Sequence, residues 1–173
     1  MVSDIPGHKG RVPLSKPVAT FRDVAAVPEF RALWIAHVLS LLGDYLAIRA
    51  KDGKVLWRIG LGQEEGACYA TAAVTTNAII FSTRGDSVMS LNPANGKTLW
   101  TFRAKGGVDS SPVVAGSTIF VGCDDGVLYG LELKTGKKVW HFTAGAEIKA
   151  SPAIAQQRMV IGSGDGAVYC FGK

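Results

Sequence analysis

The side chains that could perform catalysis are few in this 173-residue chain, and they are scattered. The three cysteines lack the Cys-x-x-Cys spacing of a zinc or redox site, and an odd number cannot close a disulfide framework. The three histidines share no motif, and no phosphate-binding loop, serine-hydrolase elbow or metalloprotease helix motif occurs. The residues concerned are Cys68, Cys123, Cys170, His8, His37 and His141. The motifs therefore identify no enzyme.

Three acidic residues next to glycines have the chemistry of cation ligands. Asp124 and Asp125 precede one glycine, and Asp165 precedes another. A calcium ion needs about six to eight oxygen ligands, and no cluster of Asp, Glu and Asn provides them. Acidic residues before glycine are also common turn formers. The sequence therefore favours turns over a metal site.

The composition is that of a globular protein without a nucleic-acid footprint. Apolar residues make up 47% of the chain, which is enough for a packed core, and the 21 glycines predict many tight turns. The formal net charge is +5, but the lysines and arginines form no run. A nucleic-acid-binding protein should cluster them on one face. We therefore expect no nucleic-acid partner.

The chain repeats itself at an offset of about 40 residues. Residues 95–100 and 135–140 are copies of one turn and strand that ends in tryptophan, and residues 52–57 are a third copy. A Ser-Pro pair followed by apolar residues occurs in residues 111–114 and again in 151–154. Each copy has the size of one supersecondary unit, so the sequence predicts a repeat protein.

Each repeat contains four short runs rich in β-branched and aromatic residues. In the clearest copy these runs are residues 112–115, 118–122, 127–133 and 138–142. Runs of this length between turn residues predict strands, and the pairs Asp52-Gly53 and Asn95-Gly96 predict two-residue hairpins. Four antiparallel strands in about 40 residues form one blade of a β-propeller. The recurring tryptophans would fill the gaps between blades.

These repeats resemble those of the PQQ-like (pyrroloquinoline-quinone-type) β-propeller family. Residues 47–57, 90–100 and 130–140 match its tryptophan-docking motif, a small residue followed by strand, turn, Gly-Lys and tryptophan. The resemblance covers residues 43–173. A WD repeat, from the wider WD40/YVTN-like superfamily, has a similar period, but its Trp-Asp pair does not occur here. The resemblance implies structural docking roles for Trp57, Trp100, Trp140, Gly53, Gly96 and Gly136.

The repeats add up to an incomplete ring. We expect an all-β partial propeller of thirteen strands: two strands of one blade, two full blades and three strands of another. Closed propellers need about four to eight blades. The sequence is then either a piece of a longer propeller or a unit that closes by oligomerising, with open blade edges that pair with another chain.

The first 43 residues follow other rules. Residues 1–20 are predicted to be a disordered leader, and residues 21–43 show helical spacing of apolar side chains. The apolar run 32–42 is shorter than the ~20 residues that span a bilayer. This segment fits a fused leader or a cleaved or uncleaved export segment, and residues 21–44 also resemble the start of a major facilitator superfamily transporter. Membrane contact is expected only if this segment anchors the chain, and the propeller repeats are assigned to residues 44–173.

The family resemblance implies two functions. Non-catalytic members resemble the lipoprotein of the outer-membrane barrel-assembly machinery, which implies a protein-interaction or scaffold module of the periplasm or cell envelope. The alternative is a fragment of a quinoprotein dehydrogenase that oxidises alcohols or sugars with PQQ and calcium. That alternative lacks an adjacent Cys-Cys pair and a chain long enough to encircle the cofactor. We expect a protein partner or self-association, and no cofactor.

A binding site should use positions at which the repeats differ. Tyr69, Asp109 and Lys149 each lie two residues before the start of a first strand, and first strands line a propeller's axis. The three side chains are therefore predicted to converge on one rim, where they could bind a polar peptide or a zwitterion. The alternative is a simple Asp109–Lys149 ion pair, worth about 0–1 kcal/mol. The lysines after the turn glycines, Lys54, Lys97 and Lys137, are interpreted as solvated.

Overall fold

A computed structural model describes residues 44–48, 54–60 and 68–172. All regular secondary structure in these ranges is β-strand. The predicted grouping into two, four, four and three strands is confirmed. The strands are β1 (Asp44–Ile48), β2 (Val55–Gly60), β3 (Ala73–Val74), β4 (Ile79–Ser82), β5 (Ser87–Leu91), β6 (Thr98–Arg103), β7 (Val113–Ala115), β8 (Thr118–Gly122), β9 (Val127–Glu132), β10 (Lys138–Thr143), β11 (Ala153–Ala155), β12 (Arg158–Gly162) and β13 (Val168–Gly172).

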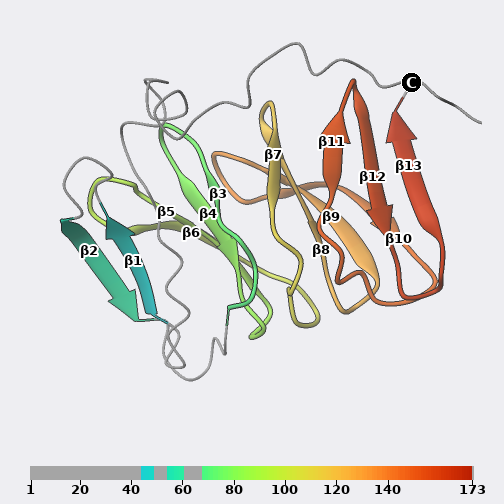
Figure 1. Cartoon of the computed structure of the whole chain (residues 1–173), viewed down its shortest axis with the longest axis horizontal. Coiled ribbons are helices and arrows are strands. Elements are labelled where there is room, and N and C mark those ends of the chain that lie inside the picture. Colours follow the sequence, from blue (N-terminus) through green and yellow to red (C-terminus); the bar gives the residue numbers. More distant parts are fainter. Residues whose placement is uncertain (1–43, 49–53, 61–67, 173) are drawn as a thin grey trace, which may run out of the picture.

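Each sheet pairs its strands antiparallel and in chain order. The sheets are β1-β2, β3-β4-β5-β6, β7-β8-β9-β10 and β11-β12-β13. Figure 1 shows them following one another in that order, from β1–β2 on the left to β11–β13 on the right. The predicted all-β partial propeller is therefore present.

The core lies between successive sheets. Ile80 and Val88 of one blade are fully buried in a cluster with Ile119 and Val121 of the next. Leu128 of that blade is buried in turn against residues of the last sheet and of the segment before it, Ile148, Met159 and Ile161. Burying one such aliphatic side chain contributes about 1.5–3 kcal/mol relative to leaving it exposed. Stacking therefore stabilises blades that could not stand alone.

The two-residue hairpin predicted at Asn95-Gly96 is wrong. Six residues, 92–97, join β5 to β6, and the Gly96 N–H donates to the Asn92 carbonyl at 2.9 Å. Within this turn only Gly96 has a positive φ, +69°. Side-chain bonds support the wider turn: the Ala94 N–H donates to Asn92 Oδ1 at 2.8 Å and the Lys97 N–H to Asn95 Oδ1 at 3.0 Å. The Asp52-Gly53 pair lies outside the described residues.

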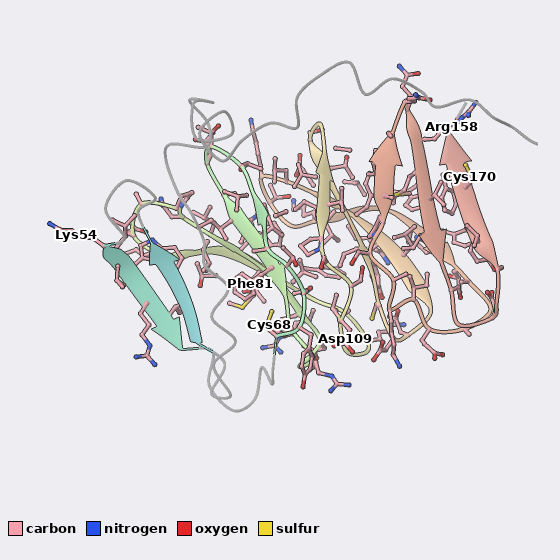
Figure 2. All side chains as sticks on the ribbon, viewed as in Figure 1. Lys54, Cys68, Phe81, Asp109, Arg158 and Cys170 are labelled. Carbon is pink, nitrogen blue, oxygen red and sulfur yellow. The ribbon has the colours of Figure 1, made fainter. Side chains whose placement is uncertain are left out.

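Antiparallel pairing places the connections alternately at two ends of the sheets. We call one end the turn rim; it holds the turns between first and second and between third and fourth strands, at residues 75–78, 92–97, 116–117, 133–137 and 156–157. The other end, the loop rim, holds residues 83–86, 104–112, 123–126, 144–152 and 163–167. In Figure 2, Arg158 marks the turn rim at the top of the view and Asp109 the loop rim at the bottom.

The predicted leader (1–20) and helical segment (21–43) lie outside the described residues. Across the ranges that the structure does describe, no helix has the length and apolar character needed to cross a membrane.

Candidate functional site

The tryptophans at the repeated docking position connect neighbouring blades through their indole N–H groups. Trp57 Nε1 donates to the Pro93 carbonyl at 2.8 Å, and Trp100 Nε1 donates to the Leu133 carbonyl at 3.1 Å. The two acceptors occupy equivalent positions in the turns after the third strand. These tryptophans therefore hold each blade to the turn of the next one.

Gly96 and Gly136 lie against the same indole rings. Both glycines have a φ of +69°, which L side chains rarely adopt. A Cβ on Gly96 would lie 2.7 Å from Cε3 of Trp57, and one on Gly136 would lie 2.4 Å from Cε3 of Trp100. Glycine is thus required for the backbone conformation and for the contact with the ring. Gly53 lies outside the described residues.

Trp140 has different surroundings. Its ring packs edge-on against Phe120, with centroids 5.9 Å apart, and against Phe171, with centroids 5.5 Å apart. The side chain is 37% exposed, and its indole N–H has no acceptor among the described residues. Trp140 therefore contributes to packing between the last two sheets without the carbonyl contact that the other two tryptophans make.

Hydroxyl groups align the first strands of successive blades. The Thr71 N–H donates to Ser111 Oγ, and the Ser111 N–H donates to Ser151 Oγ, both at 2.9 Å. The same bond thus recurs from blade to blade, and β7 and β11 lie side by side. This alignment brings the segments that hold the predicted site residues to the loop rim.

Two of the predicted site residues, Tyr69 and Asp109, are joined through Arg84. The Arg84 guanidinium carbon lies 5.1 Å from the centroid of the Tyr69 ring, a cation–π arrangement. Arg84 Nε lies 3.3 Å from Asp109 Oδ1. The Asp109 side chain is 18% exposed and the Arg84 side chain 52%. Asp109 Oδ1 is buried and has no hydrogen-bond partner among the described residues, so its contact with Arg84 is one of charge. A mostly buried carboxylate therefore attracts an accessible guanidinium that lies over an exposed aromatic ring.

Lys149 is not part of this contact. Its Nζ lies 3.9 Å from Glu147 Oε1, and among the described residues it makes no ion pair with Asp109. The Asp109–Lys149 ion pair weighed from the sequence is therefore replaced by Asp109–Arg84 and Lys149–Glu147.

The sequence prediction did not include Arg84, although the repeats also differ at its position. Arg84 aligns with Asp124 and Gly164 in the other blades. This position differs in type and in charge from blade to blade, as positions 69, 109 and 149 do. The same comparison, extended to the turn between the second and third strands, would have found it.

The acidic residues before turn glycines have a structural role. Asp125 Oδ1 accepts the Val127 N–H and Asp165 Oδ1 the Ala167 N–H, each at 2.9 Å. Their other carboxylate oxygens accept tyrosine hydroxyls: Tyr129 Oη donates to Asp125 at 2.5 Å and Tyr169 Oη to Asp165 at 2.6 Å. These bonds close the hairpin turns between second and third strands.

The tyrosine hydroxyls lower the pKa of both carboxyls. The pKa of Asp165 falls to about 2, mainly because the Tyr169 hydroxyl stabilises the carboxylate. The pKa of Asp125 also falls; partial burial opposes the shift, but the hydrogen bond from Tyr129 and other donors outweighs it. Both carboxylates are therefore ionised at neutral pH and occupied by turn contacts.

Cys123 is not an activated nucleophile. Burial raises the pKa of the Cys123 thiol to about 12, and its Sγ donates to the Gly106 carbonyl at 3.4 Å. Cys68 is buried and donates to the Ser82 carbonyl at 2.9 Å, whereas Cys170 is exposed on β13 (Figure 2). A nucleophilic cysteine needs a lowered pKa. The pKa of Cys123 is raised, so its thiol is not activated.

The described residues contain no group of three or more His, Cys, Asp or Glu side chains placed to hold a metal ion. The expectation of no cofactor stays a prediction.

A family model described as "Outer membrane protein assembly factor BamB", of the PQQ type, matches residues 43–172. The chain belongs to this family. No curated protein matches it. Among solved structures, BamB from Moraxella catarrhalis aligns with a TM-score of 0.73 at 19% identity, covering 83% of this chain and 47% of that one. This chain thus spans about half the length of that BamB.

Two computationally designed proteins share the fold. Ika4 aligns with a TM-score of 0.69 at 13% identity, covering 82% of this chain and 85% of that one. Ika8 aligns with a TM-score of 0.66 at 14% identity, covering 83% and 45%. The family match begins at residue 43, so the resemblance of residues 21–44 to a transporter finds no support. None of these comparisons names a dehydrogenase.

Proposed function

We propose that this BamB-like repeat module is non-catalytic and binds a protein of outer-membrane protein assembly through its loop rim, in the cell envelope. The observation that carries the proposal is the Tyr69–Arg84–Asp109 contact. The family description supports the assembly context, and the geometry of the rim supports a binding role.

The recurring tryptophans, glycines and serines contact the neighbouring blades, whereas two of the positions that differ between blades are accessible. Tyr69 is 59% exposed and Arg84 is more than half exposed. Tyrosine and arginine are among the residue types that contribute most to protein interfaces. Because Asp109 already orients Arg84, less side-chain freedom is lost on binding.

Site-directed crosslinking tests this proposal. A photo-crosslinking amino acid is placed at position 69, and a matched one at the exposed turn-rim position Thr135. We expect position 69 to capture one envelope protein that position 135 does not. The purified partner should then bind Arg84→Ala and Asp109→Ala at least ~10-fold more weakly than wild type. Unchanged affinity in both variants, with capture equal at both positions, would exclude the loop rim.

The alternative function, a fragment of a quinoprotein dehydrogenase, has a direct test. The chain is titrated with PQQ and calcium while the quinone absorbance is recorded. We expect no saturable shift, and a saturable one would favour the alternative.

We also propose self-association through the last sheet. Val160 and Val168 are 38% and 72% exposed there, although the equivalent residues Phe120 and Leu128 of the preceding blade pack against the next sheet. A second copy that covers this face would bury the same kind of surface. Light scattering should therefore report a mass above 18 kDa that Val168→Asp lowers. A wild-type chain that stays monodisperse at 18 kDa contradicts this proposal and leaves the loop-rim proposal intact.

A further inference from the structure

A basic residue follows the turn glycine in every repeat, and the fold brings all of them to the turn rim. Lys97 follows Gly96 and Lys137 follows Gly136. With two further basic side chains on the same rim they make a set of five, all exposed: Lys54, Lys97, Lys134, Lys137 and Arg158. Figure 2 shows Lys54 at the upper end of β2 and Arg158 at the upper end of β12. Positive charge that is scattered in the sequence is therefore gathered in space.

The described part of the turn rim has one acidic side chain, Glu132, against these five basic ones. Glu132 also accepts a hydrogen bond from the Thr135 hydroxyl. Among the described residues, Lys97, Lys134 and Lys137 make no ion pair. Their charges are therefore available to an external anion.

The loop rim has the opposite balance. Its carboxylates outnumber its basic side chains; they are Asp86, Asp109, Asp124, Asp125, Glu147 and Asp165, against Arg84, Arg103, Lys105 and Lys149. Three of these basic groups are also paired, through the Arg84–Asp109, Arg103–Asp86 and Lys149–Glu147 ion pairs. The two ends of the sheets thus differ in sign, which orients the molecule towards a negatively charged surface.

Exposed apolar side chains adjoin the lysines. In each fourth strand, an exposed apolar side chain lies two residues after the turn-rim lysine. Leu56 is 37% exposed, Leu99 50% and Val139 60%. Val55 is 56% exposed beside Lys54. Lysines next to exposed aliphatic residues fit the boundary between lipid headgroups and acyl chains.

We propose that the turn rim docks on an anionic phospholipid bilayer. Lysine-rich patches are attracted to anionic headgroups, and the neighbouring aliphatic side chains can enter the interface. Single-stranded nucleic acid fits less well, because the described turns of this rim contain no aromatic side chain for base stacking. Docking in this orientation leaves the loop rim facing away from the bilayer. The propeller would then contact the membrane directly, whether or not the N-terminal segment also anchors the chain.

Vesicle sedimentation of the full chain tests the proposal. Phosphatidylcholine vesicles with and without about one third phosphatidylglycerol provide the charged and neutral surfaces. We expect sedimentation with the anionic vesicles alone. Raising the salt from about 0.1 M to about 1 M, which shortens the Debye length from about 10 Å to about 3 Å, should release the chain.

A matched pair of double variants separates the rim from the net charge. Lys97→Gln with Lys137→Gln removes two turn-rim charges, and Lys105→Gln with Lys149→Gln removes two loop-rim charges. The first double variant should bind anionic vesicles about 30-fold more weakly than wild type, and the second should lose little. Leu99→Ser should weaken binding without changing its salt dependence. All four lysines are exposed, so both doubles should melt near wild type.

Two results would overturn the proposal. Equal losses in the two doubles would show a net-charge effect without a docking rim. Tighter binding of a short DNA duplex than of the anionic vesicles, lost in the turn-rim double alone, would assign the rim to nucleic acid instead.

Discussion

The indole of Trp100 lies against Gly136 of the next blade, so that a Cβ on that glycine would come 2.4 Å from Cε3 of the ring. The same indole donates its N–H to the carbonyl of Leu133, three residues earlier, at 3.1 Å. One side chain therefore fixes the 133–137 turn from the preceding blade. The relation recurs between Trp57, Gly96 and Pro93.

Replacing Trp100 with alanine should lower the free energy of unfolding by about 3–5 kcal/mol. The substitution removes a large ring from the cluster between two blades and leaves the Leu133 carbonyl without its donor. Trp140→Ala is the matched control and should cost less, because Trp140 is 37% exposed and lacks such an acceptor. Urea denaturation measures both. A Trp100→Ala protein with the urea midpoint of wild type would show that this ring is not a packing residue.

Gly136→Ala should destabilise the fold far more than Gly116→Ala. Both glycines have positive φ, +69° and +60°, so alanine meets a similar backbone cost of about 1–2 kcal/mol at each. A Cβ at Gly116 meets nothing within 4 Å, whereas at Gly136 it overlaps the Trp100 ring. Thermal melting of the two variants gives the difference. Equal losses would mean that the ring moves away at no cost.

The number and order of strands could be predicted from the sequence because each blade repeats its apolar pattern and its turn residues. The turn geometry could not. Asn95-Gly96 has the composition of a two-residue turn, yet six residues join the two strands. Local bonds support the wider turn, from the Ala94 N–H to Asn92 Oδ1 and from the Lys97 N–H to Asn95 Oδ1, and Trp57 contacts it from the preceding blade. The dipeptide alone contains neither.

The candidate site was predictable in part for a similar reason. Alignment of the repeats identified Tyr69 and Asp109 as neighbours on one rim, and this depended only on the period. The pairing of Asp109 with Arg84, and of Lys149 with Glu147, depends on side-chain reach across turns. The gathering of lysines on the turn rim was missed because charge was assessed along the sequence and not between the two ends of a sheet.

Replacing the two glutamines between β11 and β12 should stabilise the protein. Gln156 and Gln157 form a two-residue turn in which both have positive φ, 49° and 60°. Asn-Gly is the preferred pair for this geometry because these residues adopt positive φ at little cost. Gln156→Asn with Gln157→Gly should therefore raise the free energy of unfolding by about 1–2 kcal/mol. Chemical denaturation measures the gain. A lower midpoint would show that the glutamine side chains make contacts that outweigh the backbone strain.

One thiol per chain should react quickly in the native monomer; Cys170 pairs with Val160 on the face that self-association would cover, so the assay is run at a dilution where the chain is monomeric. Cys170 is exposed, whereas Cys68 and Cys123 are buried. Burial also raises the pKa of Cys123 to about 12, so little of the reactive thiolate forms at pH 8. A chromogenic disulfide reagent should count one thiol per chain in buffer and three in denaturant. Cys170→Ser should abolish the native signal, and a remaining fast thiol would mean that a blade opens.

The same raised pKa makes Cys123 a source of alkaline instability. The unfolded thiol ionises near pH 9, while the folded thiol stays protonated up to about pH 12. The unfolded state therefore releases its proton first, and stability falls as the pH rises between these values. Cys123→Ala should flatten the decline in stability above pH 9. An unchanged slope would assign the decline to other groups.

The Tyr169–Asp165 hydrogen bond should stabilise the fold above about pH 4 and lower the pKa of Asp165. The hydroxyl of Tyr169 donates to Asp165 at 2.6 Å, and this bond is the largest cause of the fall in the pKa of Asp165 from 3.8 to about 2. A carboxyl whose folded pKa is lowered stabilises the fold above its unfolded pKa, and the contribution is lost as the pH falls from about 4 to about 2. Tyr169→Phe removes the donor and should return the pKa of Asp165 towards its ordinary value, as carboxyl resonances in an NMR titration would show. Tyr129→Phe is the matched control, because it should raise the pKa of Asp125 and leave that of Asp165 unchanged. If Asp165 still titrates near pH 2 in Tyr169→Phe, the backbone N–H groups of Ala167 and Gly145 hold the carboxylate and the tyrosine contributes nothing to it.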